Sequence, residues 1–326
     1  MRISVLGGGS WGTTLAAQAA RAGHELRIWV RSPAIAASLN DRRENPAYLP
    51  GIELPAGLRA TAELGAALAD AEAVIVAVPS EYCRGIYRQA APLVPKGALF
   101  VSATKGLETD TLQRMTEVAA AEAPGHALAV LSGPSFALEV AKTLPTAVVV
   151  ASEDHAVAER VQRALATRSF RVYSSEDVVG VELAGAVKNV IAIAAGIIDG
   201  LGYGHNTVAA LVTRGLAEIS RLSVALGGRP DTLAGLAGLG DLVLTCTGSL
   251  SRNRTLGQRL GRGQSLAEAS AGLHPEGVRT TLASTALAER HGIDLPIARQ
   301  MKAVLYQGKA PREALEELML RSLKRE

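Results

Sequence analysis

Lys188 is the residue of this sequence best suited to proton transfer. It lies in a long helix-period segment, and the residues that share its helical face are small or apolar: Ala184, Gly185, Ile191 and Ala192. A lysine on such a face is costly to bury as a cation, which favours its use as a general acid/base. A lysine whose stem crosses an apolar surface to reach solvent is the alternative.

Lys105 and the segment 132–137 each follow a predicted strand at the point where that strand ends. The carboxyl ends of strands in an open α/β sheet line the ligand crevice, so both positions are expected to face a bound molecule. Turns after strands are rich in Gly, Ser and Pro whatever their function, so neither cluster identifies a site by itself.

Residues 238–254, GLGDLVLTCTGSLSRNR, combine one acid, Asp241, with several hydroxyl groups and a basic cluster. A guanidinium forms charge-assisted hydrogen bonds with phosphate, so Arg252, helped by Ser251 and Asn253, is a candidate phosphate clamp. A solvated basic loop is the alternative. A nucleic-acid surface is disfavoured because aromatic residues, which would stack on bases, are only 3% of the chain.

Gly7, Gly9 and Gly12 form the pattern G-x-G-x-x-G between a predicted strand at 3–7 and a predicted helix at 13–23. In dinucleotide-binding folds these glycines allow a tight turn, close approach of the backbone to pyrophosphate, and close packing of helix on strand. The N–H groups and the positive dipole end of the helix then face the phosphates. The placement of the pattern therefore predicts a dinucleotide site rather than an ordinary turn.

The end of the second predicted strand, 26–30, selects between the two nicotinamide dinucleotides. A carboxylate there would accept a hydrogen bond from the ribose of NAD, whereas an arginine would pair with the extra phosphate of NADP. The strand ends in Trp29-Val30-Arg31-Ser32, without an acid. Arg31 therefore favours NADPH over NADH, with a solvated surface arginine as the alternative.

The composition is that of a folded protein with a small positive charge: 48% hydrophobic and 20% charged residues, and a net charge of +3 over 326 residues. The two cysteines, Cys83 and Cys246, exclude a disulfide framework and are expected to be small buried residues. The six histidines lack metal-ligand spacing, so no metal is predicted. We find no secretion signal and no apolar run near the length of a membrane span, so a cytoplasmic protein is expected.

Short apolar runs separated by Gly and Pro dominate the first part of the chain, and helix-period segments dominate the rest. Most of the runs are continuous, which is typical of strands buried on both faces of a parallel sheet. The predicted fold class is therefore α/β, with a Rossmann-like doubly wound sheet in residues 1–175 and an all-helical domain in residues 176–326. The predicted strands are 3–7, 26–30, 73–79, 99–103, 128–134, 147–152 and 170–174, and the plainest predicted helices are 13–23, 111–125, 176–199, 207–227, 280–292 and 311–325.

A set of motifs in a fixed order gives the sequence a resemblance to a known family. Through essentially its whole length it resembles the bacterial-type NAD(P)+-dependent sn-glycerol-3-phosphate dehydrogenases. The motifs are GGGSWGT at the start, SATKGL at 102–107, LSGPSFA at 131–137, ELAGAVKNVIAIAAGIIDGLG at 182–202, GLGDLVLTCT at 238–247, SRNR at 251–254 and EGVRT at 276–280. Several motifs in one order are more specific than any of them alone.

The resemblance implies a role for each matching position. The implied dinucleotide contacts are Gly7, Gly9, Ser10, Trp11, Gly12, Arg31, Lys105, Ala137, Arg252 and Glu276. The implied substrate contacts are Lys105, Gly133, Ser135, Lys188, Asp241, Ser251, Arg252 and Asn253. Lys188 is implied as the general acid/base, in a catalytic group with Lys105, Asn189, Asp241 and Thr245.

The implied reaction is reversible hydride transfer between NADPH, or NADH, and C2 of a three-carbon phosphate. Dihydroxyacetone phosphate becomes sn-glycerol 3-phosphate, a precursor of glycerophospholipids, as Lys188 gives a proton to the developing alkoxide and Lys105 stabilises its charge. A homodimer is also implied. One departure from the family is Leu273-His274-Pro275, where aliphatic or small residues are expected. It leaves open the backbone position of a cofactor contact at His274, but not the chemistry.

Two alternative functions stay open from the residues. One is a β-hydroxyacid or 6-phosphogluconate-type dehydrogenase of the same architecture, whose substrate carries a carboxylate. The other is a non-catalytic NADPH-binding sensor. A sensor has no need of a proton relay, so the presence of Lys105, Lys188 and Asp241 argues against it.

Overall fold

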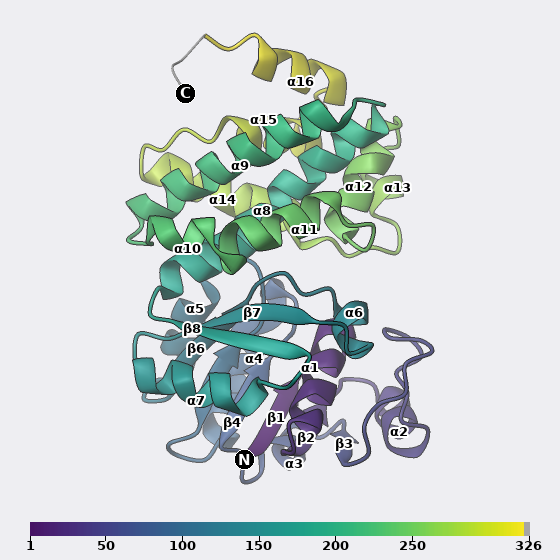
Figure 1. The fold of residues 1–326 in the computed structure, drawn as a ribbon, viewed down its shortest axis with the longest axis vertical. Coiled ribbons are helices and arrows are strands. Elements are labelled where there is room, and N and C mark those ends of the chain that lie inside the picture. The colour runs from purple at the N-terminus through teal and green to yellow at the C-terminus, as the bar shows by residue number, and fades with distance from the viewer. Residues whose placement is uncertain (323–326) are drawn as a thin grey trace. The chain divides into compact units, whose positions relative to one another are not determined.

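The short apolar runs form one sheet in the computed structural model, which describes residues 1–322 of the chain. The strand order is β3-β2-β1-β4-β5-β6-β7-β8 (Figure 1). The strands are β1 (Arg2–Leu6), β2 (Glu25–Trp29), β3 (Leu58–Thr61), β4 (Ala73–Val76), β5 (Leu99–Ser102), β6 (Ala127–Ser132), β7 (Thr146–Ala151) and β8 (Phe170–Ser175). Each predicted strand is present, and the order changes direction between β1 and β4, which is the switch point of a doubly wound fold.

The sheet differs from the prediction in two ways. Strand β3 was not predicted, because its four residues, LRAT, bury only Leu58 and Ala60 and carry little apolar signal. Every pairing is parallel except that of β6 with β7, which is antiparallel. Parallel neighbours are usually joined by a crossover helix, whereas the connection between these two strands, residues 133–145, contains only a five-residue helix.

Helices pack on both faces of this sheet, as the doubly wound prediction requires. Val5 of β1 shares one buried cluster with Leu15 of α1 and Leu165 of α7. Leu6, the next residue, points to the opposite face and shares a second cluster with Tyr87 of α4. These helices are α1 (Ser10–Arg21), α2 (Pro33–Asp41), α3 (Leu64–Leu68), α4 (Ser80–Ala90), η1 (Ala91–Leu93), α5 (Met115–Glu122), α6 (Ala137–Ala141) and α7 (His155–Leu165).

The chain divides into two units, which are described separately. Unit 1 comprises Met1–Lys105 and Gln113–Glu182, and therefore contains the whole sheet. Unit 2 comprises Gly106–Leu112 and the chain from Leu183 onward. The short segment 106–112 thus belongs to the unit whose other residues follow it by more than seventy positions in the sequence.

Segment Gly106–Leu112 of unit 2 contains no helix, whereas from Leu183 onward the described part of unit 2 consists of helices and the turns between them. Its elements are α8 (Val178–Gly200, from Leu183 on), α9 (His205–Ala225), α10 (Pro230–Ala234), the π-helix η2 (Leu236–Gly240), α11 (Asp241–Thr247), α12 (Arg252–Gly261), α13 (Leu266–Ser270), α14 (Glu276–Arg290), α15 (Pro296–Tyr306) and α16 (Pro311–Met319). Each helix predicted after residue 175 is present. The last one ends at Met319, before the predicted 325; Arg321, outside the helix, pairs with Asp294 at 2.8 Å, and residues 323–325 of the prediction lie outside the described residues.

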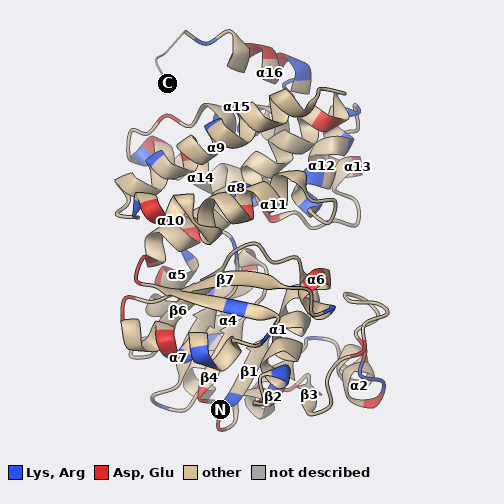
Figure 2. Ribbon diagram, viewed as in Figure 1, with Lys and Arg blue, Asp and Glu red and all other residues tan. Residues whose placement is uncertain are grey.

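Helix α8 corrects the statement that no apolar run approaches the length of a membrane span. An 18-residue stretch within its 23 residues reaches a mean hydropathy of 1.8, which is long and apolar enough by composition alone. All of that stretch is buried inside the protein, which is the behaviour of a core helix. Only Glu182, Lys188 and Asp199 of its 23 residues are charged. Figure 2 shows charged positions along other helices, such as α7 and α12.

Glycines let α8 and α12 cross backbone to backbone. A Cβ on Gly196 of α8 would lie 2.0 Å from the Arg254 carbonyl oxygen, and a Cβ on Gly257 of α12 would lie 2.0 Å from the Ile193 carbonyl oxygen. No side chain fits at either position, so these glycines fix the distance between the two helices. The crossing sets where the first residues of α12, including Arg252, stand relative to Lys188 on α8.

Candidate functional site

The glycine loop between β1 and α1 combines two tightly packed glycines with one that faces open space. Gly7 has φ +122°, and a Cβ there would lie 2.6 Å from the Ala77 carbonyl oxygen. A Cβ on Gly12 would lie 1.9 Å from the Gly7 carbonyl oxygen. A Cβ on Gly9, in contrast, would meet nothing within 4 Å. Gly7 and Gly12 are therefore required by packing, whereas Gly9 leaves room for a ligand to approach the backbone.

The residues that follow the loop fit a dinucleotide. Gly9 is the N-cap of α1 and no side chain caps the helix, so its first N–H groups are presented at the switch point of the sheet. The Trp11 Nε1 donor is buried without a hydrogen-bond partner among the described residues. The Ser10 hydroxyl donates to the Tyr48 carbonyl oxygen at 2.6 Å. Uncapped donors and an unpaired indole N–H suit an anionic ligand.

Arg31 lies just beyond the carboxyl end of β2, where the sequence predicts a phosphate partner. It is exposed, and no hydrogen bond or ion pair joins it to a residue within 1–322. Ser32 caps the helix that follows, since its hydroxyl accepts from Ile35 N–H at 3.4 Å. The guanidinium is thus held near the end of a fixed strand and is available to an anion.

Lys105, Gly133 and Ser135 meet at the carboxyl ends of β5 and β6. Lys105 Nζ donates to the Gly133 carbonyl oxygen at 2.8 Å, and the Ser135 hydroxyl donates to the same oxygen at 2.9 Å. Gly133 has φ +129° and lies against β7, where a Cβ would be 3.0 Å from Val148 Cα. The Ala137 carbonyl oxygen accepts from Thr14 of α1 at 3.1 Å, which ties this turn to the helix of the glycine loop.

Lys188 lies 5% exposed in the middle of α8 and is paired with Asp241. Its ammonium donates to Asp241 Oδ1 and, at 2.8 Å, to Thr245 Oγ1. The Thr245 hydroxyl donates in turn to the Asp241 carbonyl oxygen at 2.6 Å. The buried cation is therefore compensated by a carboxylate that is itself only 1% exposed, and the snorkelling alternative is wrong for Lys188.

A π-helix places Asp241 where it can pair with Lys188. Residues 236–240, LAGLG, form the π-helix η2, and a Cβ on Gly238 would lie 2.1 Å from the Leu233 carbonyl oxygen. Asp241 is consequently the first residue of α11, and Thr245 follows one turn later on the same face. Such irregular turns inside helices occur frequently at functional sites. Cys246, beside them, is buried, and burial raises the pKa of its thiol to about 12, so it is no nucleophile.

Asn189 and Asn253 join three helices next to this pair. Asn253 Nδ2 donates to Asn189 Oδ1 at 2.9 Å, and Asn253 Oδ1 accepts from Gly277 N–H at 2.9 Å. Arg252, between the cap Ser251 and Asn253, is exposed and has no hydrogen bond or ion pair to a residue within 1–322. Of the three predicted phosphate ligands, Arg252 is thus the one that projects from the protein.

Glu276 is the first residue of α14, half-buried, directly before Gly277. His274 lies in the segment that departs from the residues expected in the resembled family. It adopts φ +47°, a left-handed backbone conformation that is unusual for a residue with a side chain. The departure therefore coincides with a special backbone conformation in the turn that enters α14.

Several structural features escaped sequence reasoning. Asn45, fully buried, donates to the Gly8 carbonyl oxygen at 2.9 Å. The dipeptide Asn-Pro signals a turn, but nothing in the sequence indicates that the turn reaches the glycine loop.

Glu218 of α9 is a second such feature. It is 3% exposed and accepts from Ile297 N–H at 2.6 Å and Ala298 N–H at 3.2 Å. Burial raises its pKa to about 7, outweighing these hydrogen bonds.

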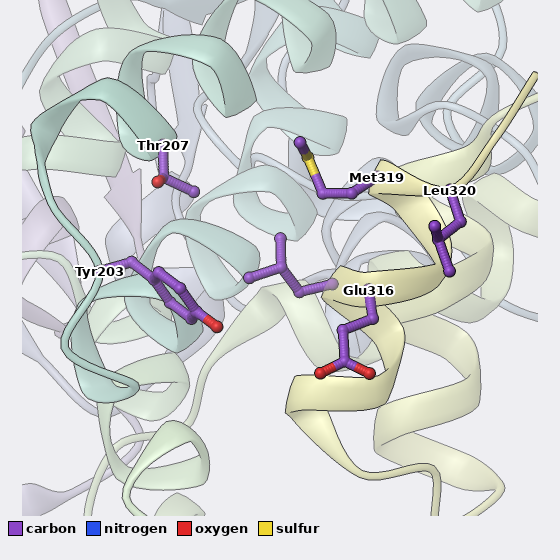
Figure 3. A pocket seen from close by; sticks show the side chains of 6 residues that line it. Tyr203, Thr207, Glu316, Met319 and Leu320 are labelled. Atoms are coloured by element: carbon purple, nitrogen blue, oxygen red, sulfur yellow. The ribbon is translucent and has the colours of Figure 1, made fainter. Parts of the chain in front are cut away.

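Neither a metal-binding cluster nor the surface cavity of unit 2 contributes to the candidate site among the described residues. Within the described residues no group of three or more His, Cys, Asp or Glu side chains could hold a metal ion. A surface cavity of about 370 Å³ in unit 2 contains none of the predicted site residues (Figure 3). It is lined by Tyr203, Thr207, Leu315, Glu316, Met319 and Leu320, and is mostly apolar.

The chain matches known proteins over nearly its full length. Residues 2–158 match the model of the NAD-dependent glycerol-3-phosphate dehydrogenase N-terminus, and residues 177–316 match that of its C-terminus. The chain is 52% identical to glycerol-3-phosphate dehydrogenase (NAD(P)+) of Citrifermentans bemidjiense, over 100% of this chain and 98% of the relative. The identity to the Nitratidesulfovibrio vulgaris enzyme is also 52%, over 100% of both chains. The crystal structure of glycerol-3-phosphate dehydrogenase from Coxiella burnetii superimposes with a TM-score of 0.94 at 41% identity, covering 98% of this chain and 99% of that one.

Proposed function

The chain belongs to the NAD-dependent glycerol-3-phosphate dehydrogenase family, and from this membership we propose how its own residues carry out the reaction. It is an oxidoreductase that reduces dihydroxyacetone phosphate to sn-glycerol 3-phosphate with NAD(P)H, reversibly, and so supplies glycerophospholipid synthesis. The observation that carries the residue assignment is the buried Lys188–Asp241–Thr245 group.

Lys188 is the general acid in the direction of reduction. When bound, the nicotinamide supplies the hydride that reduces the carbonyl carbon. The Lys188 ammonium gives its proton to the oxygen of that carbon as negative charge develops there. Asp241 compensates the ammonium and favours its re-formation after the transfer, while Thr245 fixes the direction of the Nζ–H bonds. Lys105 is a second cation for the same oxygen, and Asn189 supports the group.

The substrate phosphate is bound by a clamp of Arg252, Ser251 and Asn253. This assignment is supported by the exposure of Arg252 and by the hydrogen bonds that hold its two neighbours. Gly133 and Ser135 are further substrate contacts. Binding energy from a phosphate remote from the reacting carbon can hold that carbon in register, so the clamp acts on turnover as well as on affinity.

The dinucleotide lies on the glycine loop and is NADP(H) by preference, with NAD(H) also accepted. Gly9 and the N–H groups of Ser10 and Trp11 take the pyrophosphate, an assignment supported by the open space at Gly9. Arg31 takes the phosphate that distinguishes NADP from NAD, supported by its exposure at the end of β2. The remaining proposed contacts are Gly7, Gly12, Lys105, Ala137, Arg252 and Glu276.

Residues 1–175 form the dinucleotide domain in this proposal, and residues 176–326 form the helical domain that carries the substrate and catalytic groups. The enzyme needs no metal, because Lys188 and Lys105 supply the positive charge that a Lewis acid would. A cytoplasmic homodimer is proposed on the strength of the family resemblance, and sedimentation of the purified protein measures its mass directly.

The test is the loss of NADPH absorbance when dihydroxyacetone phosphate is added to the purified protein, with NADH in parallel. We expect consumption of both, faster with NADPH. The same protein is offered β-hydroxyacids and 6-phosphogluconate with NADP+, and no reduction of NADP+ is expected. Turnover of an acid instead of dihydroxyacetone phosphate would move the substrate to the carboxylate class and leave Arg252 as its anion partner.

A further inference from the structure

The glycine loop is held by a segment that the dinucleotide-binding pattern does not include. Residues 45–49, Asn-Pro-Ala-Tyr-Leu, lie between α2 and β3 and are here called the strap. The strap closes on itself, since Leu49 N–H donates to the Asn45 carbonyl oxygen at 2.8 Å. Leu49 is 2% exposed and belongs to the same buried cluster as Leu15 of α1, so the far end of the strap is anchored in the core.

Asn45 attaches the strap to the loop with its whole side chain. It is 0% exposed, and its Nδ2 donates to the Gly8 carbonyl oxygen at 2.9 Å and to Thr13 Oγ1 at 2.8 Å. Its Oδ1 accepts from Tyr48 N–H at 3.3 Å. Both amide protons are therefore used, one on the middle of the glycine loop and one on the first turn of α1.

The Gly8 carbonyl is the group whose direction matters. A loop that binds an anion through its N–H groups must keep its carbonyl oxygens turned away from that anion. The Gly8 oxygen receives Asn45 Nδ2 and, at 3.4 Å, Thr13 Oγ1. A Cβ on Gly8 would lie 2.3 Å from Val30 Cγ1, so this residue is also packed tightly on its other side. Asn45 thus holds the peptide in an orientation compatible with phosphate binding.

A second attachment joins the strap to the residue after the loop. The Ser10 hydroxyl donates to the Tyr48 carbonyl oxygen at 2.6 Å. A hydroxyl has one proton, so Ser10 meets a phosphate through its main-chain N–H while this bond is intact.

We propose that Asn45 is a positioning residue for the dinucleotide, acting through the Gly8 peptide, with the Ser10–Tyr48 hydrogen bond as its second attachment. The inference rests on the proposed binding of the dinucleotide at the glycine loop. Because the pyrophosphate is common to both cofactors, loss of the strap's attachment weakens the binding of NADPH and of NADH to the same extent. Turnover at saturating cofactor stays close to wild type, since Asn45 touches no reacting atom.

The test measures cofactor dissociation constants by fluorescence titration, together with kcat at saturating cofactor and Tm, for Asn45→Ala. We expect the Kd of both NADPH and NADH to rise about tenfold, with kcat within about twofold of wild type. The matched control is Gln18→Ala. Gln18 is also a buried amide of unit 1, 1% exposed, and donates to the Leu165 carbonyl oxygen at 3.0 Å and Thr167 Oγ1 at 2.9 Å, away from the loop. Its replacement lowers Tm and leaves both Kd values unchanged.

A milder pair keeps the test decisive if Asn45→Ala does not fold. Pro46 is an exposed residue of the strap, and Pro46→Gly loosens the strap without removing a hydrogen bond. We expect both Kd values to rise about threefold, whereas Pro124→Gly, at an exposed loop position of unit 1, changes neither.

The outcomes separate this inference from the proposed function. If the wild-type protein binds neither cofactor, both are overturned. If it binds them and the strap variants bind equally well, or no worse than their controls, the role of Asn45 is overturned and the dinucleotide site stands. A rise in Kd for NADPH alone would also overturn it, because the effect would then lie at the ribose phosphate.

Discussion

The glycine loop and the Lys188 group differ in the chemical groups that each offers to a ligand. The loop offers main-chain N–H groups and empty space, and the glycines that matter there lie within six consecutive residues. The Lys188 group consists of side chains buried in a helical core, and its partners lie 53 and 57 residues away in the sequence. A surface for a phosphate can be encoded locally because every residue except proline carries a main-chain N–H donor. A buried proton donor needs a compensating charge, which only the tertiary fold supplies.

The two regions are therefore sensitive to different substitutions. In the loop, adding a methyl group to a glycine is disruptive, whereas the identity of most side chains matters little. At the Lys188 group the side-chain functional group is decisive, and its removal leaves Asp241 without the ammonium that compensates its charge. The substitutions below test this difference between the two regions.

Replacing Lys188 should have the largest effect. For Lys188→Ala we expect kcat for dihydroxyacetone phosphate to fall about 10³-fold, because the proton donor is lost. The Kd of NADPH should stay within about twofold of wild type. Lys302→Ala is the matched control, since Lys302 also forms an ion pair in unit 2, with Glu289 at 3.3 Å, but on the surface. Retained turnover, or loss of cofactor binding in the folded variant, would contradict the assignment.

Glu218→Gln tests the buried carboxylate that, unlike Asp241, has no ion-pair partner within 4 Å among residues 1–322. The folded protein holds the Glu218 proton up to a pKa of about 7, whereas the unfolded chain releases it near 4.5. The native state therefore binds more protons between these values, so the free energy of unfolding falls as pH rises through this window, by about 3 kcal/mol. The variant should lose this decline, as measured by urea unfolding at pH 4.5 and pH 8. If the free energy of unfolding had the same pH dependence in both proteins, burial would not raise the pKa of Glu218.

Gly9→Ala separates ligand space from packing space. The new Cβ meets no protein atom within 4 Å, so Tm should be unchanged, while the Kd of both cofactors rises about tenfold through contact with the pyrophosphate. Gly12→Ala is the contrasting variant, because its Cβ would lie 1.9 Å from the Gly7 carbonyl oxygen and should lower Tm. Unchanged cofactor affinity in Gly9→Ala would place the dinucleotide elsewhere.

Arg31→Ala should have the smallest effect, confined to the choice of cofactor. We expect kcat/KM for NADPH to fall about fivefold and that for NADH to stay constant, since an exposed charge pair contributes about 1 kcal/mol. Arg59→Ala, which removes another exposed arginine of unit 1, is the control. Equal losses with both cofactors would mean that Arg31 does not read the ribose phosphate.

The sequence was most informative where function is local. The glycine pattern, Arg31 at a strand end and the apolar surroundings of Lys188 could all be recognised from adjacent or helically spaced residues. Asp241 and Thr245 could be joined to Lys188 only through the family resemblance, because nothing local indicates that the π-helix at 236–240 aims α11 at α8. Strand β3 and the antiparallel pairing of β6 with β7 were not predicted, because short edge strands and strand direction depend on pairing across the sheet. Asn45 was missed for the same reason: its partners are fixed by the fold.

The division of the chain has a consequence for how the protein is made. Residues 106–112 belong to unit 2, yet they leave the ribosome long before Leu183 and the helices that complete that unit. Unit 1 has all its residues once Glu182 has been synthesised, whereas this segment must wait for the chain from Leu183 onward. A fragment cut at the end of the sheet would thus carry an orphaned stretch, and the complementary fragment would lack one. Neither half is a free-standing module, so an engineer who wishes to exchange the helical part for another must also transplant those seven residues.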